Sequence, residues 1–192
     1  MEVVRSIKNA VGGNSMNICN MMSFDTSSTS SGWALFQNAK LSKYDTILHK
    51  EKEVDLFQKM DLMIVDLLVL LETYKPLIVV IERPPYKNDP KTLTALSEIV
   101  GAVRAWSILN KADYVEYTPS QWRKLVKDED EKLPTDRNEL KAWDIEKVRK
   151  LYGIENIGDD PADSILIGQA RINEVNEWID SGYAVEIDEE VA

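Results

Sequence analysis

The chain has 192 residues, of which 44% are apolar and 29% are charged. This composition fits one globular domain and excludes a disordered chain or a membrane protein. Its longest apolar run, residues 62–71, is interrupted by Asp66 and is too short to cross a bilayer. The first residues lack a signal pattern, so we expect a cytoplasmic protein with no membrane partner. The net charge of −10 disfavours a protein that simply coats nucleic acid, because phosphate binding needs basic side chains.

The N-terminal segment contains Gly12-Gly13-Asn14-Ser15 and no periodic pattern, so we expect residues 1–16 to form a flexible arm. An apolar strand then ends at Asp25. A polar turn over 26–31 leads into a second strand over 32–36. In this hairpin Asp25 lies where the first strand meets the turn.

The next segments alternate between strand and helix patterns. A third strand is expected over 44–49, followed by apolar residues at helical spacing over 54–74. Residues 77–81 then form a continuous apolar run rich in β-branched side chains, which is typical of a strand buried on both faces of a sheet. Glu82 directly follows this run, so a second acid stands at the end of a strand.

Beyond residue 83, the spacing predicts in order a helix over 93–109, a strand over 114–117, a short helix over 121–126, a flexible loop over 127–134 and a helix over 139–152. A last helix is expected from about 161 to 180, with Asp160 and Asp163 in its first turn. The remaining residues, 181–192, form an acidic tail. The alternation of strands and helices indicates one α/β domain over 17–180.

Four acids at element ends, Asp25, Glu82, Asp160 and Asp163, form a candidate metal site. Mg²⁺ takes oxygen ligands, and a two-metal phosphodiesterase needs several carboxylates around ions roughly 4 Å apart. Asp25 and Glu82 can meet only if the first and fourth strands are parallel neighbours.

Each acid also has an ordinary structural interpretation. Asp160 could cap the last helix, Asp163 could interact with its dipole, and the Ser/Thr-rich turn could hydrogen-bond Asp25. Glu82 is the hardest to explain in this way, because after five apolar strand residues its carboxylate would be partly desolvated without a partner.

Four segments resemble the motifs of RuvC-like Holliday junction resolvases, members of the ribonuclease-H-like superfamily, in the family's order: Ser23–Ala34, Ile81-Glu82-Arg83, Leu93–Val103 and Asp160–Leu166. The resemblance implies a five-stranded mixed sheet flanked by helices, with Gly101 touching the sheet. It implies that the four acids bind two Mg²⁺ ions per site, with Mn²⁺ able to substitute. It further implies a homodimer that cuts four-way or other branched DNA junctions into 5′-phosphate and 3′-hydroxyl ends, and a phage-type resolvase fits the acidic sequence.

Basic residues follow the fifth predicted strand. Gln121-Trp122-Arg123 resembles the family's Gln-x-Lys segment, and Lys141 resembles a lysine that begins the next helix. Such cations would stabilise negative charge on the leaving group. Arg123 would do so without transferring a proton, because arginine is a poor proton donor. The alternative is an ordinary solvated helix face. The candidate DNA contacts are Arg83, Tyr86, Lys87, Lys91 and Lys124, although Pro84-Pro85-Tyr86 could equally be a rigid turn.

Two other classes of function remain open. Residues 25–32 also resemble the phosphate-binding turn of actin-like ATPases and sugar kinases, but the chain has no second Gly-rich phosphate segment. In a non-catalytic protein that binds DNA junctions, the acids would only cap secondary structure. Metal-dependent cutting distinguishes the nuclease from both.

Overall fold

The computed structural model describes residues 20–50, 53–84 and 90–181. The predicted arm over 1–16 and nearly all of the predicted acidic tail lie outside the described residues. The elements are β1 (Met21–Asp25), β2 (Ser30–Gln37), β3 (Lys40–Leu48), α2 (Leu56–Tyr74), β4 (Ile78–Glu82), α3 (Pro90–Leu109), β5 (Asp113–Tyr117), α4 (Pro119–Val126), α5 (Arg137–Tyr152) and α6 (Asp159–Asp180).

The described strands form one five-stranded sheet in the order β3-β2-β1-β4-β5. Strand β2 is antiparallel to β1 and β3, whereas β1, β4 and β5 run parallel. The predicted α/β class and five-stranded mixed sheet are therefore confirmed. The third strand is longer than predicted, because residues 38 and 39 adopt positive φ and turn the chain tightly into Lys40.

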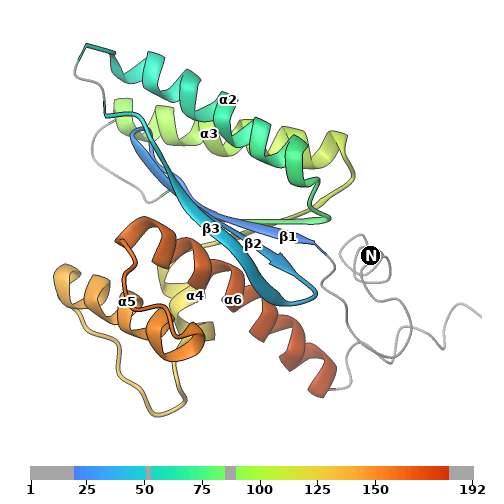
Figure 1. Cartoon of the computed structure of the whole chain (residues 1–192), viewed down its shortest axis with the longest axis vertical. Coiled ribbons are helices and arrows are strands. Elements are labelled where there is room, and N and C mark those ends of the chain that lie inside the picture. Colours follow the sequence, from blue (N-terminus) through green and yellow to red (C-terminus); the bar gives the residue numbers. More distant parts are fainter. Residues whose placement is uncertain (1–19, 51–52, 85–89, 182–192) are drawn as a thin grey trace, which may run out of the picture.

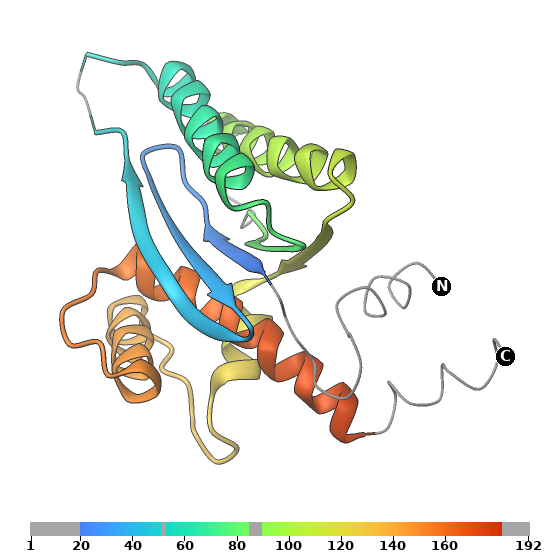
Figure 2. The same cartoon turned by 45° about the vertical axis from the view of Figure 1, so that its right-hand side comes forward.

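Helices cover both faces of the sheet. Helices α2 and α3 lie on one face, and α4, α5 and α6 lie on the other (Figures 1 and 2). Alternation along β1 sends Met22 and Phe24 into the α2/α3 core, while Met21 belongs to the core on the α6 side. The same alternation places Asp25 and Glu82 at the α6 side of the sheet.

Helix α3 is, within the described ranges, the one helix long and apolar enough to cross a membrane. The core helix of a globular domain can have the same length and composition. In α3, Ala95, Ile99 and Val103 face the sheet and are buried in the core. The expected contact of Gly101 with the sheet is wrong. Gly101 is exposed, and a Cβ added there would meet no atom within 4 Å.

The close contacts with the sheet are instead made by α6. A Cβ added to Gly168 would lie 2.2 Å from the Phe36 ring and 2.7 Å from Ser23 Oγ, so glycine lets the helix approach β1 and β2. The Ser23 hydroxyl donates a hydrogen bond of 2.6 Å to the carbonyl oxygen of Ser164. These contacts fix α6 along the strands that carry the first acid.

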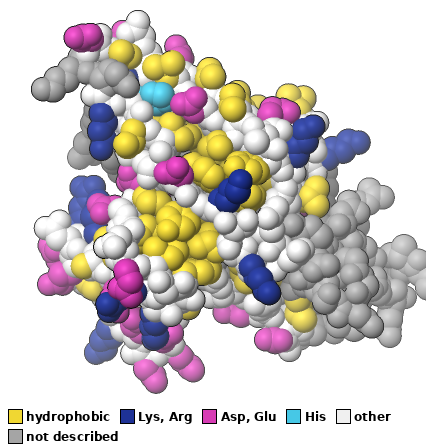
Figure 3. Space-filling model, in the orientation of Figure 1, with side chains coloured by type: hydrophobic (Ala, Val, Ile, Leu, Met, Phe, Trp, Pro, Cys, Tyr) yellow, Lys and Arg dark blue, Asp and Glu magenta, His cyan; other side chains and the backbone are white. Residues whose placement is uncertain are grey.

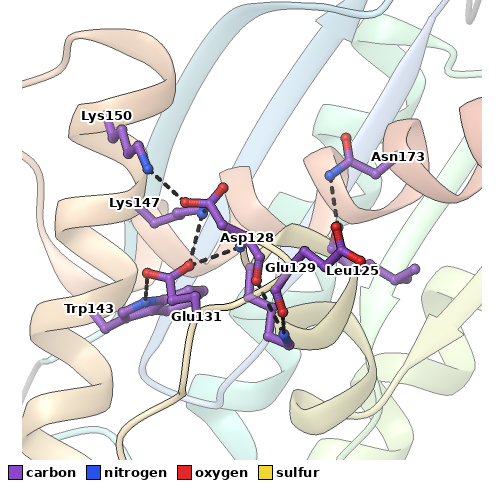
Figure 4. A network of polar contacts seen from close by, with 9 residues as sticks. Leu125, Asp128, Glu129, Glu131, Trp143, Lys147, Lys150 and Asn173 are labelled. Atoms are coloured by element: carbon purple, nitrogen blue, oxygen red, sulfur yellow. Dashed lines mark hydrogen bonds and ion pairs between the residues drawn. The ribbon is translucent and has the colours of Figure 1, made fainter.

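The segment predicted as a flexible loop over 127–134 is held by α5. Lys147, with a side chain only 3% exposed, forms ion pairs of 3.1 Å with both Asp128 and Glu131. Trp143 also donates a 2.7 Å hydrogen bond to Glu131 (Figure 4). A buried ammonium group needs such partners, so this network fixes how α4 connects to α5.

Candidate active site

Strands β1 and β4 bring the first two acids together. The parallel register pairs Phe24 with Ile81, so Asp25 and Glu82 follow at the same edge of the sheet. The prediction that the first and fourth strands adjoin is confirmed. Glu82 Oε2 accepts a hydrogen bond of 2.7 Å from the indole Nε1 of Trp122, a fully buried residue of α4.

The other two acids come from the start of α6. The helix is capped by Gly158, so Asp160 lies inside the first turn and is not the cap. Asp163 lies in the second turn rather than the first. The Ser30 hydroxyl of β2 donates a hydrogen bond to Asp160. One carboxylate oxygen of Asp163, Oδ1, is buried and has no hydrogen-bond partner in the described part of the chain.

The acids are close enough to perturb one another. Burial, followed by the charges of Glu82 and Asp160, raises the pKa of Asp25 to about 8. Burial, followed by the charges of Asp25 and Asp144, raises the pKa of Asp163 well above its ordinary value. Clustered carboxylates of this kind favour a proton or a metal cation between them.

The donor set suits a hard divalent cation, since carboxylate oxygens are what Mg²⁺ prefers and the free Asp163 Oδ1 is a ligand atom without another partner. Within residues 20–50, 53–84 and 90–181, no three Asp, Glu, His or Cys side chains converge tightly enough to complete a metal cluster. The chemistry and the position of these carboxylates therefore suit a divalent metal ion. To bind one, their side chains would have to move closer together.

The two cations predicted beside the acids are both in ion pairs. The Arg123 guanidinium makes a bidentate contact with Asp144 of α5: Nε donates to Oδ1 at 3.0 Å, and Nη2 donates to Oδ2 at 2.7 Å. It also lies 4.0 Å from the centre of the Trp122 ring. Lys141 pairs with Asp159 in the first turn of α6. The charges of Arg123 and Lys141 oppose the rise in the pKa of Asp25, so both cations lie near that carboxylate.

The candidate DNA contacts are scattered. Arg83 is exposed after β4 and bonds Glu116 at 3.1 Å. Lys91, at the start of α3, and Lys124, on α4, are also exposed. Tyr86 and Lys87 lie outside the described residues. Over α4 and α5, basic and acidic side chains intermingle in Figure 3, so this face carries no patch of one sign.

No protein-family model matches the sequence, and no curated protein is similar to it. Solved structures are similar to the fold. Thermus thermophilus RuvC in complex with its Holliday junction substrate gives a TM-score of 0.64 at 13% identity, over 83% of this chain and 96% of that one. The fowlpox virus resolvase in complex with Holliday junction DNA gives a TM-score of 0.54 at 16% identity, over 81% of this chain and 98% of that one. The yeast mitochondrial Holliday junction resolvase Ydc2 gives a TM-score of 0.53 at 14% identity, over 90% of this chain and 84% of that one.

The chain has the RuvC-like resolvase fold. This likeness agrees with the resemblance of the four sequence motifs. In this fold Asp25 and Glu82 end the neighbouring strands β1 and β4, and Asp160 and Asp163 come from the start of α6.

Sequence reasoning missed several residues that contact the candidate site residues. Asp144 could have been found, because Leu140, Asp144 and Val148 recur at helical spacing and place the acid on the buried stripe of α5. Trp122 entered only as the middle residue of the Gln-x-Lys resemblance, but a buried indole N–H needs an acceptor, and Glu82 supplies it. Ser30 and Asp159 carried no signal beyond their polarity.

Proposed function

We propose that this protein is a metal-dependent endonuclease that cuts branched DNA, with the four-way junction as its preferred substrate. The observation that carries the proposal is the set of carboxylates at one edge of a resolvase fold. Among them, burial and the neighbouring acids raise the pKa of Asp25, and Asp163 keeps a buried oxygen without a partner in the described part of the chain. An ordinary helix cap or strand-end acid would have a hydrogen-bond donor instead.

In this proposal Asp25, Glu82, Asp160 and Asp163 hold two Mg²⁺ ions, for which Mn²⁺ can substitute. Bound there, the ions would activate water and stabilise the leaving 3′ oxygen. The chain's own residues prepare this site. Trp122 orients Glu82, Ser30 orients Asp160, and Arg123 adds positive charge for the scissile phosphate. The expected products carry 5′-phosphate and 3′-hydroxyl ends.

Branched DNA is the proposed substrate because two of the similar structures are complexes with Holliday junctions. Arg83, Lys91 and Lys124 are exposed, so we propose that they contact phosphates, and we extend this role to Tyr86 and Lys87. Because acids surround these cations, phosphate contacts would be few and local. We further propose a cytoplasmic location, either in a bacterial cell or in a phage-infected host, and no membrane partner.

A homodimer would give each junction two active sites, one for each strand that is cut. Helix α2 supports this proposal, because Leu62, Val65 and Val69 are 44%, 55% and 57% exposed and their spacing places them on one side of the helix. Hydrophobic side chains are visible along the edge of the molecule where α2 runs (Figures 1 and 3). Such a stripe is typical of an interface between subunits.

The decisive experiment incubates the purified chain with a four-way junction, a flap, a linear duplex and an RNA/DNA hybrid, each with and without Mg²⁺. We expect paired nicks in the junction, only with metal. Asp25→Asn and Glu82→Gln should abolish cutting while junction binding persists. Glu98→Gln, an exposed acid on α3, is the matched control and should cut normally.

Other outcomes would change the proposal. Preferential cutting of the hybrid would indicate a ribonuclease H, and broad cutting of branched DNA would indicate a debranching enzyme. Junction affinity that is unchanged in Asp25→Asn, together with no Mg²⁺ or Mn²⁺ binding by calorimetry, would indicate a non-catalytic junction-binding protein. Nucleotide binding without nuclease activity would indicate the actin-like alternative.

A further inference from the structure

The pair formed by Arg123 and Asp144 joins two helices beside the acids. Arg123 comes from α4 and Asp144 from α5, and the guanidinium binds the carboxylate through both Nε and Nη2. The Asp144 side chain is 1% exposed and that of Arg123 is 13% exposed. A two-point contact of this kind fixes the plane of the guanidinium, which a single bond or a lysine could not do.

The pair leaves part of the guanidinium available. Arginine has five N–H donors, and only Nε–H and one Nη2–H are used by Asp144. The remaining donors make no hydrogen bond to another side chain or carbonyl in the part of the chain that the structure describes. The charge of Arg123 nevertheless acts on Asp25, Glu82 and Asp163, so the guanidinium lies among the candidate ligands.

Asp144 itself also reaches the acid cluster. Its charge is among the causes that raise the pKa of Asp163, so the two carboxylates lie near each other. A chain of contacts thus runs from Glu82 through Trp122 and Arg123 to Asp144, and it ends near Asp163 of α6. Through this chain, the position of α5 is transmitted to both ends of the site.

Taking the proposed nuclease function as given, we propose that Asp144 is a positioning residue, which holds the Arg123 guanidinium so that its free donors bind the scissile phosphate. Asp144 does not touch the DNA. It acts by keeping Arg123 in one orientation before the substrate arrives, so that little reorganisation is needed when charge develops on the phosphate.

The alternative is that the pair only joins α4 to α5. Lys147 provides the comparison, because it lies one turn further along α5 and joins the same helix to the α4–α5 connection through Asp128 and Glu131 (Figure 4). Substitution of Asp128 weakens that connection without touching Arg123. Asp128→Asn is therefore the matched control for Asp144→Asn.

The test is a double-mutant cycle on the full chain, with single-turnover cleavage of a four-way junction as the readout. Asp144→Asn should lower the cleavage rate about 100-fold, as expected for a group displaced by about an ångström, with junction affinity maintained. Asp144→Asn should have no further effect in an Arg123→Ala background. Added guanidinium ion should partly rescue Arg123→Ala, but not the double variant, because Asp144 is needed to bind the ion.

A second readout is independent of cleavage. In a ¹⁵N-labelled protein, the Nε–H of Arg123 should exchange slowly with solvent in the wild type and in Asp128→Asn, and quickly in Asp144→Asn. The proposal is overturned if Asp144→Asn slows cleavage equally with and without Arg123, or no more than Asp128→Asn at matched thermal stability. Unchanged Nε–H exchange would also overturn it. A wild-type chain that cuts no branched DNA would refute the proposed function, and the exchange measurement would still decide whether Asp144 holds Arg123.

Discussion

A Cβ atom placed on Gly32 would lie 1.9 Å from the carbonyl oxygen of Asp160. Gly32 stands opposite Asp25 in the β1–β2 ladder, so the absence of a side chain there lets the first turn of α6 approach the first acid. Gly32→Ala must push this turn away. We expect about 100-fold slower junction cleavage and a loss of about 1–3 kcal/mol in the free energy of unfolding.

Gly101→Ala is the control for this substitution, since a Cβ at Gly101 meets nothing within 4 Å. Alanine in the middle of α3 should stabilise the protein by about 0.5–1 kcal/mol and leave cleavage unchanged. Denaturant unfolding and single-turnover kinetics measure both effects. Equal activity of Gly32→Ala and the wild type would show that the close approach of β2 and α6 is not required.

Stability without metal should depend on pH through Asp25. Its pKa rises from 3.8 to about 8 on folding, so the folded chain binds this proton more tightly than the unfolded chain. The stabilisation is complete below the unfolded pKa and is lost as the pH rises through the folded value. We expect the free energy of unfolding to fall by several kcal/mol between these limits in the presence of a chelator, because each pKa unit corresponds to about 1.4 kcal/mol.

Asp25→Asn should flatten this pH dependence, whereas substitution of the exposed Asp45 on β3 should leave it intact. Mg²⁺ should also flatten it, because a bound cation favours the charged carboxylate. Thermal melts at several pH values provide the measurement. A wild-type stability that rises across this range would contradict the raised pKa.

Lys147 should contribute far more stability than its neighbour Lys150. Lys147→Ala removes a buried cation from two carboxylates and should cost about 2–4 kcal/mol. Lys150 also pairs with Asp128, at 2.6 Å, but its side chain is 63% exposed, so solvent screens the pair and Lys150→Ala should cost far less stability. Urea unfolding of the two variants measures the difference, and similar costs would argue against the role of burial.

The α2 stripe should control the oligomeric state. Val65→Asp is expected to convert a dimer into monomers, because a carboxylate in an apolar interface loses its hydration. Leu151→Asp, at a residue 45% exposed on α5 across the sheet, is the control and should leave the mass unchanged. Sedimentation equilibrium measures both. A wild-type chain that is monomeric at all concentrations would rule out this interface.

The fold could be predicted from the sequence because its strongest signals are local. The apolar run before Glu82 and the helical spacing in α2 depend on burial of each element by itself, and both were correct. Asp25 and Glu82 could likewise be predicted as site residues, since a carboxylate that follows a buried strand needs a partner. Boundaries were less accurate, as at β3, because a tight turn with positive φ left no clear glycine signal.

The partners of the site residues could not be predicted in the same way. Arg123 and Asp144 are 21 residues apart and meet only through the packing of two helices. The requirement for glycine at position 32 likewise depends on a helix that begins more than a hundred residues later. The family resemblance suggested Gly101 for a close contact, but in this chain Gly32 and Gly168 make it.

The position of α6 along the chain has a consequence for how the protein is made. A nascent chain that has emerged from the ribosome only as far as α5 has neither Asp160 nor Asp163, and the β1–β2 face that α6 covers is still bare. The acidic cluster can form only when this late helix docks on an already assembled sheet. An incompletely synthesised chain would therefore lack the complete acidic cluster and, under the proposed function, would be unable to cut DNA.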